Sequence, residues 1–343
     1  MRNETRVLFN AYLKRQADLN GVPDASRRFS VTPTVEQTLA VRVQESSDFL
    51  KLVNVIGVDQ QSGEKLGLSA SGPVASRTNT TLAERQPRNL VALDEEGYHC
   101  HQTNFDTAIT YGMLDAWAKF PNFQTLVRNK TIEQIGRDRL MVGWNGKAVS
   151  PSTNISENPL LQDVNIGWLE HIRTQAPARR MSAMKVGTDI GHDYRSLDAL
   201  VFDAINNLLD PWHAEATDLV VIVGRELLNE KYLPLVNGTD APTEIAALNN
   251  LLLSRTLGGK RAITVPFFPS RSLLVTSTSN LSIYFQTGTT RRAIIDNPKR
   301  DRVEDFVSVN EAYVVEELGK VALVDDIRLP ASDGTWENEE PVP

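Results

Sequence analysis

The sequence predicts an α+β fold for a chain of 343 residues. Apolar residues recur at helical spacing in several segments up to Leu208, whereas the segments after Ala262 are short apolar runs typical of strands. The chain contains no series of alternating strands and helices and no internal repeat. A chain of this length suits about two domains with a substantial core.

The composition is that of a soluble globular protein. Apolar residues make up 41% of the chain and charged residues 23%, and no apolar run approaches the length of a membrane span. The first residues, MRNETRVLFNAYLKRQ, contain no uninterrupted apolar segment, so no secretory signal is predicted. The protein is therefore expected to stay in the cytoplasm in which it is made.

Cysteine content and net charge exclude several classes of protein. Cys100 is the single cysteine, which excludes an intramolecular disulfide and a multi-cysteine metal site. The net charge of −7 argues against a dedicated nucleic-acid-binding protein, because such proteins need clustered basic residues to neutralise phosphates.

The N-terminal region predicts two helices. The first ends at Gly21 and Pro23, and the second begins at residues 34–37, where Thr-Val-Glu-Gln has the pattern of a capping box. An extended segment follows at residues 52–58. Four apolar residues fall on one face of the first helix at helical spacing: Leu8, Phe9, Tyr12 and Leu13.

The segment from Gln60 to Asn89 is unusual because Ser, Thr, Gly and Ala dominate it and large apolar residues are few. Such a segment cannot bury much of its own surface. It is either a disordered linker or a long hairpin arm whose partner is another chain. A strand is predicted directly after it, over residues 105–111, from the alternation of apolar and polar side chains.

The middle of the chain predicts three helices. The first runs from Phe123 to about Met141 and is expected to end at the glycines 143 and 146. The second is expected to begin at Asn158, and the third is capped by Ser196. The apolar faces of the second and third consist of Leu161, Val164, Trp168 and Ile172, and of Leu197, Leu200, Val201, Ala204 and Leu208.

The C-terminal part predicts strands around residues 262–265, 273–276, 280–286 and 302–324. The last residues, 331–343, are acidic and contain several prolines, and they are expected to be disordered.

Three patterns contain residue types that occur in catalytic or metal sites. His99, Cys100 and His101 are metal-ligand types, but on a strand the two histidines face away from the cysteine, which favours an ordinary exposed strand end. The pairs Ser182/Lys185 and Ser62/Lys65 have the spacing of a Ser-Lys nucleophile without its supporting motifs. No catalytic residue, cofactor or metal is predicted.

The stretch DLVVIVGRELL, residues 218–228, predicts a strand, a turn and a helix. A phosphate-binding loop needs several glycines or a Lys followed by Ser or Thr, and this stretch has only Gly224 followed by Arg225 and Glu226. A buried strand leading into a helix is therefore favoured, with Leu219, Val221 and Val223 on one face.

Clustered charges suggest contacts between copies of the chain. Like-signed runs usually form a solvated face, and individual exposed ion pairs contribute only about 0 to 1 kcal/mol, so such contacts would set register more than affinity. The basic candidates are Arg291, Arg292, Lys299, Arg300 and Arg302, and the acidic candidates are Asp94, Glu95 and Glu96.

Several segments give the chain a family resemblance. They include RNETRVLFNAYL, QESSDFL, ERQPR, NPLLQDVNIGWL, SLDALV, DLVVIVGRELLNEKY, NLSIY and NPKRDRVED. In these segments, which reach from the first residues to about Glu317, the sequence resembles the major capsid protein of the peduovirus group of tailed temperate phages. Departures lie in loops, such as residues 186–195 and 237–244, and in the C-terminal tail.

This resemblance implies the HK97-like capsid fold. Its parts would be a removable leader (1–31), an N-terminal arm (32–58), an extended loop (59–104), a peripheral domain with a spine helix (105–218), an axial domain (219–288), a return to the peripheral domain (289–330) and the acidic tail (331–343).

The resemblance also implies the function. The protein would be a non-enzymatic capsid subunit that forms pentamers and hexamers of itself, encloses the DNA genome through non-specific interior contact, and works with a scaffold, a maturation protease and a portal, without a membrane. It would be located in the virion capsid, and in the host cytoplasm during assembly. The alternative is a soluble cytoplasmic hydrolase or nucleotide-dependent enzyme that uses residues 219–228.

The connector between the two N-terminal helices is the expected processing region. Residues 27–33 look exposed and extended, because Pro33 disfavours helix at the residue before it. The sequence alone favours a merely flexible terminus, and the resemblance adds that the leader is cut off near Phe29, Ser30, Val31 and Thr32.

Overall fold

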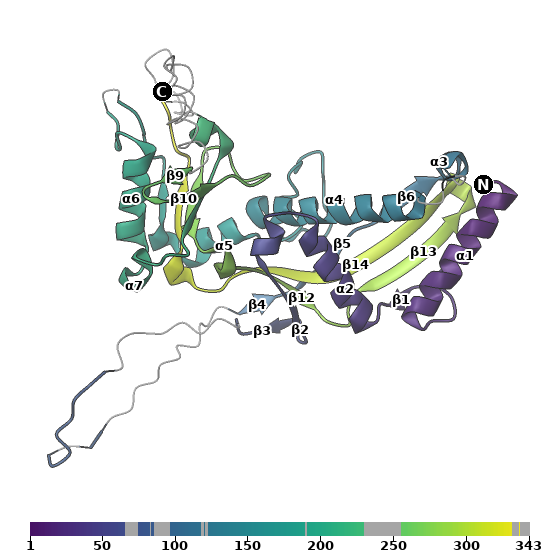
Figure 1. Ribbon diagram of the computed structural model, residues 1–343, viewed down its shortest axis with the longest axis horizontal. Helices are drawn as coiled ribbons and strands as arrows, with labels where there is room; N and C mark the ends of the chain where they lie inside the picture. Colours follow the sequence, from purple (N-terminus) through teal and green to yellow (C-terminus); the bar gives the residue numbers. More distant parts are fainter. Residues whose placement is uncertain are drawn as a thin grey trace, which may run out of the picture.

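A computed structural model describes residues 1–65, 75–82, 84–85, 97–117, 120, 123–188, 191–229, 255–330 and 336 (Figure 1). Two β-sheets lie at opposite parts of the molecule and helices cover both, which confirms the predicted α+β class. No helix among these residues is long and apolar enough to cross a membrane.

The larger sheet has seven strands in the order β1-β13-β14-β12-β2, and two further strands, β5 and β6, both pair with β14. The 14-residue strand β14 organises this sheet, since it spans about 46 Å and pairs with four others. The bounds are β1 Phe29–Ser30, β2 Asn54–Val58, β5 His101–Asn104, β6 Thr107–Thr110, β12 Leu281–Gln286, β13 Arg291–Asn297 and β14 Arg302–Val315.

The smaller sheet has six strands in the order β7-β15-β11-β8-β10-β9. The bounds are β7 Arg180–Ser182, β8 Val220–Val223, β9 Thr256–Leu257, β10 Lys260–Ile263, β11 Leu273–Thr276 and β15 Ala322–Asp325. Both of its faces are buried, because Val221 and Val223 belong to one core while Ile222 belongs to another. A strand covered on both faces reads as a continuous apolar run, which explains the sequence VVIV.

Seven labelled α-helices lie in the described ranges, and residues 225–229 are also helical. The seven are α1 Asn3–Asn20, α2 Pro33–Glu45, α3 Tyr111–Trp117, α4 Phe123–Asn145, α5 Trp168–Gln175, α6 Leu197–Leu208 and α7 Pro211–Ala214. Short 3₁₀ helices lie at Leu50–Leu52, Pro177–Arg179, Thr278–Asn280, Pro298–Arg300 and Leu318–Lys320. In Figure 1, α4 runs along the larger sheet, α1 lies against its β13 side, and α6 covers the outer face of the smaller sheet.

Helix α4 matches the predicted spine helix but continues past the glycine expected to end it. Its 23 residues span about 34 Å. A Cβ at Gly143 would lie 2.4 Å from Cζ3 of Trp168, whose side chain is fully buried. Gly143 therefore allows α5 to pack closely on α4, and the chain leaves the helix only after Asn145.

The second predicted helix in the middle of the chain begins later than expected. Residues 153–167 form turns, Leu161 has a φ of 58°, and α5 starts only at Trp168. Leu161 and Val164 still pack against the same core as Trp168. The apolar spacing of Leu161, Val164 and Trp168 thus indicates packing against a common core and not a continuous helix. The third helix is confirmed, since the Ser196 side chain accepts a hydrogen bond from the Ala199 amide at 3.3 Å.

The segment predicted as an arm has a paired base. Strands β3 (Ser62–Gly63) and β4 (Tyr98–His99) form an antiparallel two-stranded sheet. The described residues 75–82 lie far from the larger and the smaller sheet (Figure 1). The Leu82 amide donates to the Asn79 carbonyl at 3.0 Å, which closes a turn. These features favour the hairpin arm over the linker. The side chain of Leu82 is 85% exposed.

Three boundaries differ from those predicted. Strand β6 ends at Thr110, and the next residue begins α3. The smaller sheet includes β7 and β15 from outside residues 219–288, while β12 belongs to the larger sheet. Within the tail, Trp336 is only 8% exposed and pairs with Pro330, which contradicts disorder at that position.

Candidate assembly surfaces and the junction between the sheets

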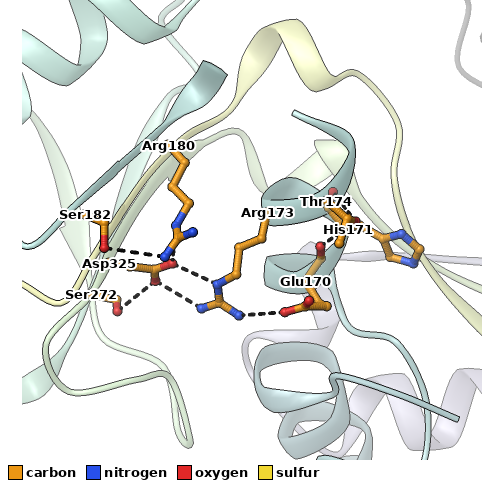
Figure 2. A network of polar contacts seen from close by, with 8 residues as sticks. All are labelled: Glu170, His171, Arg173, Thr174, Arg180, Ser182, Ser272 and Asp325. Carbon is orange, nitrogen blue, oxygen red and sulfur yellow. Dashed lines mark hydrogen bonds and ion pairs between the residues drawn. The ribbon is translucent and has the colours of Figure 1, made fainter. Parts of the chain in front are cut away.

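Helix α5 connects the two sheets through a network of charged side chains (Figure 2). Asp325 on β15 accepts two hydrogen bonds from Arg173 on α5, at 2.8 Å from Nε and 3.1 Å from Nη2. It also accepts from Nε of Arg180 on β7 at 3.0 Å and from the hydroxyl of Ser272 at 3.2 Å. One carboxylate therefore joins α5 to strands β15 and β7 of the smaller sheet and to the residue before β11.

The same helix is tied to the larger sheet. The indole Nε1 of Trp168 donates to the backbone carbonyl of Ser282 on β12 at 2.9 Å. Trp168 packs edge-on against Trp144 of α4 and Tyr313 of β14, with ring centroids 4.9 and 5.4 Å apart. Because α5 binds both sheets, it fixes the angle between them.

Asp325 remains ionised in this network. Burial on its own would raise the pKa of Asp325, but the hydrogen bonds and charge of Arg173, together with the charge of Arg180, outweigh burial and hold that pKa below its usual value.

A second ion pair holds the spine helix α4 on the long strand β14. It joins buried Arg139 on α4 to buried Glu311 on β14, with the Arg139 Nε 3.0 Å from the Glu311 Oε1.

The expected processing region lies on the edge of the larger sheet. Phe29 pairs with Arg292 and Ser30 with Arg291 as strand β1, and the Val31 amide donates to the Thr290 carbonyl at 2.8 Å. The segment is extended, as predicted, but Phe29 is only 8% exposed and Val31 only 5%. The prediction of an exposed connector is wrong for these two residues; Ser30 is exposed and Thr32 half-buried.

The predicted capping box does not form. Helix α2 begins at Pro33, and its N-cap residue makes no side-chain capping bond. Glu36 is instead buried and accepts from the amides of Gly288 and Thr290, at 2.8 and 3.2 Å, and from the Thr290 hydroxyl. Glu36 thus anchors the N-terminal arm to the turn before β13, a role that no local sequence pattern indicates.

The basic cluster is divided between internal and surface positions. Arg292 contacts Asp305 at 2.6 Å, Gln16 at 3.0 Å and Tyr12 at 3.1 Å, and Arg302 contacts Glu304 at 2.6 Å. These two residues are engaged within the chain and are poor candidates for contact with a neighbour. The remaining three, Arg291, Lys299 and Arg300, are exposed. Their predicted partners Asp94, Glu95 and Glu96 lie outside the described residues.

The histidine-cysteine segment is arranged as the strand pattern predicts. The rings of His99 and His101 lie 4.5 Å apart on one side, while Cys100 is fully buried on the other. Burial, with a contribution from Glu311, raises the pKa of the Cys100 thiol to about 12. Within the described ranges, no group of three or more His, Cys, Asp or Glu side chains could hold a metal ion.

The remaining catalytic patterns do not gain support from the geometry. The hydroxyl of Ser62 lies 2.6 Å from Nδ1 of His99, and that of Ser182 accepts from Arg180 at 3.4 Å. A Cβ at Gly224 would lie 2.0 Å from the Ser270 carbonyl oxygen. The glycine after β8 therefore permits close backbone packing, as a buried strand leading into a helix requires.

The model of the family described as phage major capsid protein, P2 family, matches residues 8–327. The chain belongs to this family of phage major capsid proteins. The capsid proteins of Escherichia phage P2 are 45% identical over 344 residues, covering 96% of both chains. The major capsid protein of Serratia phage KSP20 is 40% identical over 340 residues, covering 95% of this chain and 97% of that one.

A solved structure has the same fold. The procapsid of satellite phage P4, which includes a size determination protein, contains a chain that superimposes with a TM-score of 0.80 at 43% identity, covering 96% of this chain and 99% of that chain. The HK97-like capsid fold that the resemblance implied is thus confirmed, and this chain is a major capsid protein. An enzymatic use of residues 219–228 is not favoured.

Proposed function

We propose that copies of this chain assemble as pentamers and hexamers into the icosahedral head shell of a tailed phage, which encloses the DNA genome. The hairpin arm carries this proposal. Leu82 at its tip is 85% exposed, and the turn lies away from the body of its own subunit (Figure 1). An apolar side chain held at the end of a hairpin gains burial only from another molecule, and in a shell that molecule is a neighbouring copy.

The proposed partners follow from the same role. They are a scaffold and a maturation protease during assembly in the host cytoplasm, a portal, and packaged DNA that touches the interior without sequence preference. The net charge of −7 supports the last point, since it disfavours tight binding of DNA to the inner wall.

Assembly is tested by deleting residues 63–85 and imaging the product after co-expression with a phage scaffold. The unaltered chain is expected to give closed shells, and the deletion variant a folded subunit without shells. Leu82→Ser is the matched point variant and is expected to lower shell yield without changing the circular dichroism of the free subunit. Normal shells from the deletion variant would contradict the assignment of the arm.

We also propose that the leader, residues 1–31, is removed during maturation. A protease binds its substrate as an extended, accessible strand, and β1 is extended but paired with β13, with Phe29 and Val31 buried. Cleavage therefore requires that β1 leave the edge of the sheet. Intact-mass measurement of subunits from DNA-filled heads tests the proposal: chains that begin near Thr32 are expected, and chains that begin at Met1 or Arg2 would contradict it.

A further inference from the structure

The leader helix α1 has a second apolar face that its own subunit does not cover. Phe9 and Ala17 are 8% and 6% exposed and face the larger sheet. Leu8, which is expected to share a face with Phe9, is 47% exposed, and Val7 beside it is 68% exposed. The prediction for Leu8 is wrong because the inward face is narrower than the apolar spacing suggests.

Four residues on the outer face form a straight seam. Glu4, Leu8, Ala11 and Arg15 follow one another at intervals of four, three and four residues, which is the spacing of coiled-coil core positions. All four are exposed. Among the residues that the structure describes, neither Glu4 nor Arg15 forms an ion pair. The seam thus has an acidic end, an apolar centre and a basic end.

We propose that this seam pairs with the same seam of a second copy, antiparallel, about a twofold axis that passes between the levels of residues 9 and 10. Antiparallel helices place the two kinds of core position opposite each other. In this register Leu8 faces Ala11 of the partner subunit, and Glu4 faces Arg15 of the partner subunit. Each contact occurs twice, as an isologous interface requires.

Charge and size select this arrangement. A parallel pair would place Glu4 opposite Glu4 of the partner subunit, which is repulsive. The small side chain of Ala11 allows the helix axes to approach to about 8 Å, at which the larger Leu8 fills the space opposite. The opposite charges at the two ends of the seam therefore specify both the direction and the register of the pair.

The contact is too small to hold two free subunits together. It comprises two contacts between Leu8 and Ala11 of the partner subunit and two partly exposed ion pairs. Each ion pair contributes about 0 to 1 kcal/mol. A shell holds neighbouring leaders at high effective concentration, so a contact of this size becomes occupied there. The inference rests on the proposed assembly into shells, and it predicts pairing within precursor shells that still contain residues 1–31.

Disulfide trapping tests the pairing in precursor shells made without the protease. In the proposed register, the two copies of residue 11 lie within the Cα separation that a disulfide needs. Ala11→Cys is expected to give mainly disulfide-linked dimers on mild oxidation, and Leu8→Cys is the second variant if the first gives no shells. Asn10→Cys, exposed on a different side of α1, is the control and is expected to give few dimers. Cys100 is fully buried and does not compete.

Charge exchange tests the register. In the Ala11→Cys background, Arg15→Glu is expected to reduce the dimer yield several-fold, and Glu4→Arg in the same chain is expected to restore it. Lys14→Glu makes the same change of charge away from the seam and is expected to leave the yield unchanged. If Arg15→Glu abolishes shells, rescue of shells by Glu4→Arg supports the pairing equally.

Two results would overturn the inference. One is an Ala11→Cys yield no higher than that of Asn10→Cys in intact shells. The other is a defect of Arg15→Glu that Glu4→Arg fails to rescue, which would assign this face to a different partner such as the scaffold. Either result leaves the proposed shell function standing, whereas failure of the unaltered chain to form shells would contradict that function itself.

Discussion

Replacing Asp325 with Asn tests whether the junction network stabilises the subunit. The substitution keeps the shape of the side chain and removes the charge that Arg173 and Arg180 share. Removing one partner of a buried ion pair costs about 3 to 5 kcal/mol. The Asp325 side chain is 8% exposed, but those of Arg173 and Arg180 are 22% and 36% exposed and keep some hydration. We therefore expect a loss at the lower end, about 3 kcal/mol.

The assay is urea denaturation of the unassembled subunit, with the midpoint and slope compared between variants. Glu170→Gln is the matched control, because Glu170 also contacts Arg173, at 3.2 Å, but is a partly exposed pair within one helix. Its loss is expected to cost less than about 1 kcal/mol. Equal losses for the two variants, or an unchanged midpoint for Asp325→Asn, would refute the view that Asp325 joins α5 to the smaller sheet.

Three further predictions follow from the same structure. Folding lowers the pKa of Asp325, so the ionised side chain contributes its full free energy of stabilisation above the unfolded pKa of about 3.9. This stabilisation is lost as the pH falls through the lower native pKa. Asp325→Asn should therefore make the free energy of unfolding depend less on pH in the acid range. Gly143→Ala should destabilise the subunit by about 1 to 3 kcal/mol through its clash with Trp168, whereas Gly112→Ala, with open space around it, should stabilise it slightly in the same denaturation assay. Cys100 should resist thiol reagents at pH 8 in the native subunit and react fully in urea; equal rates in both states would contradict its burial.

Local patterns predicted the elements whose structure depends on near neighbours in the chain. Ser196 caps α6, and the VVIV run forms β8 with both faces buried. The resemblance supplied the fold that connects them. Patterns failed where a distant residue decides the outcome. Glu36 bonds to residues more than 250 positions away, and α2 begins at Pro33, ahead of the cap predicted at Thr34. Leu161 adopts a positive φ and reaches the core from a turn.

The candidate site was predicted only in part for the same reason. The basic cluster is visible in the sequence, but Arg292 turns inward because Asp305, Gln16 and Tyr12 surround it in the fold. No sequence pattern indicates the network around Asp325, because its members come from four separate segments of the chain. The burial of Phe29 depends on pairing with β13, which lies at the other end of the chain.

In the proposed shell, the hairpin arm that carries Leu82 gains its burial from neighbouring copies. Cryo-electron microscopy of precursor shells, at a resolution that traces the chain, tests it most directly. We expect pentamers and hexamers of this chain in which residues 75–82 lie on an adjacent subunit and Leu82 is buried there. Particles in which the arm folds back on its own subunit, or preparations that contain only small discrete oligomers, would contradict it.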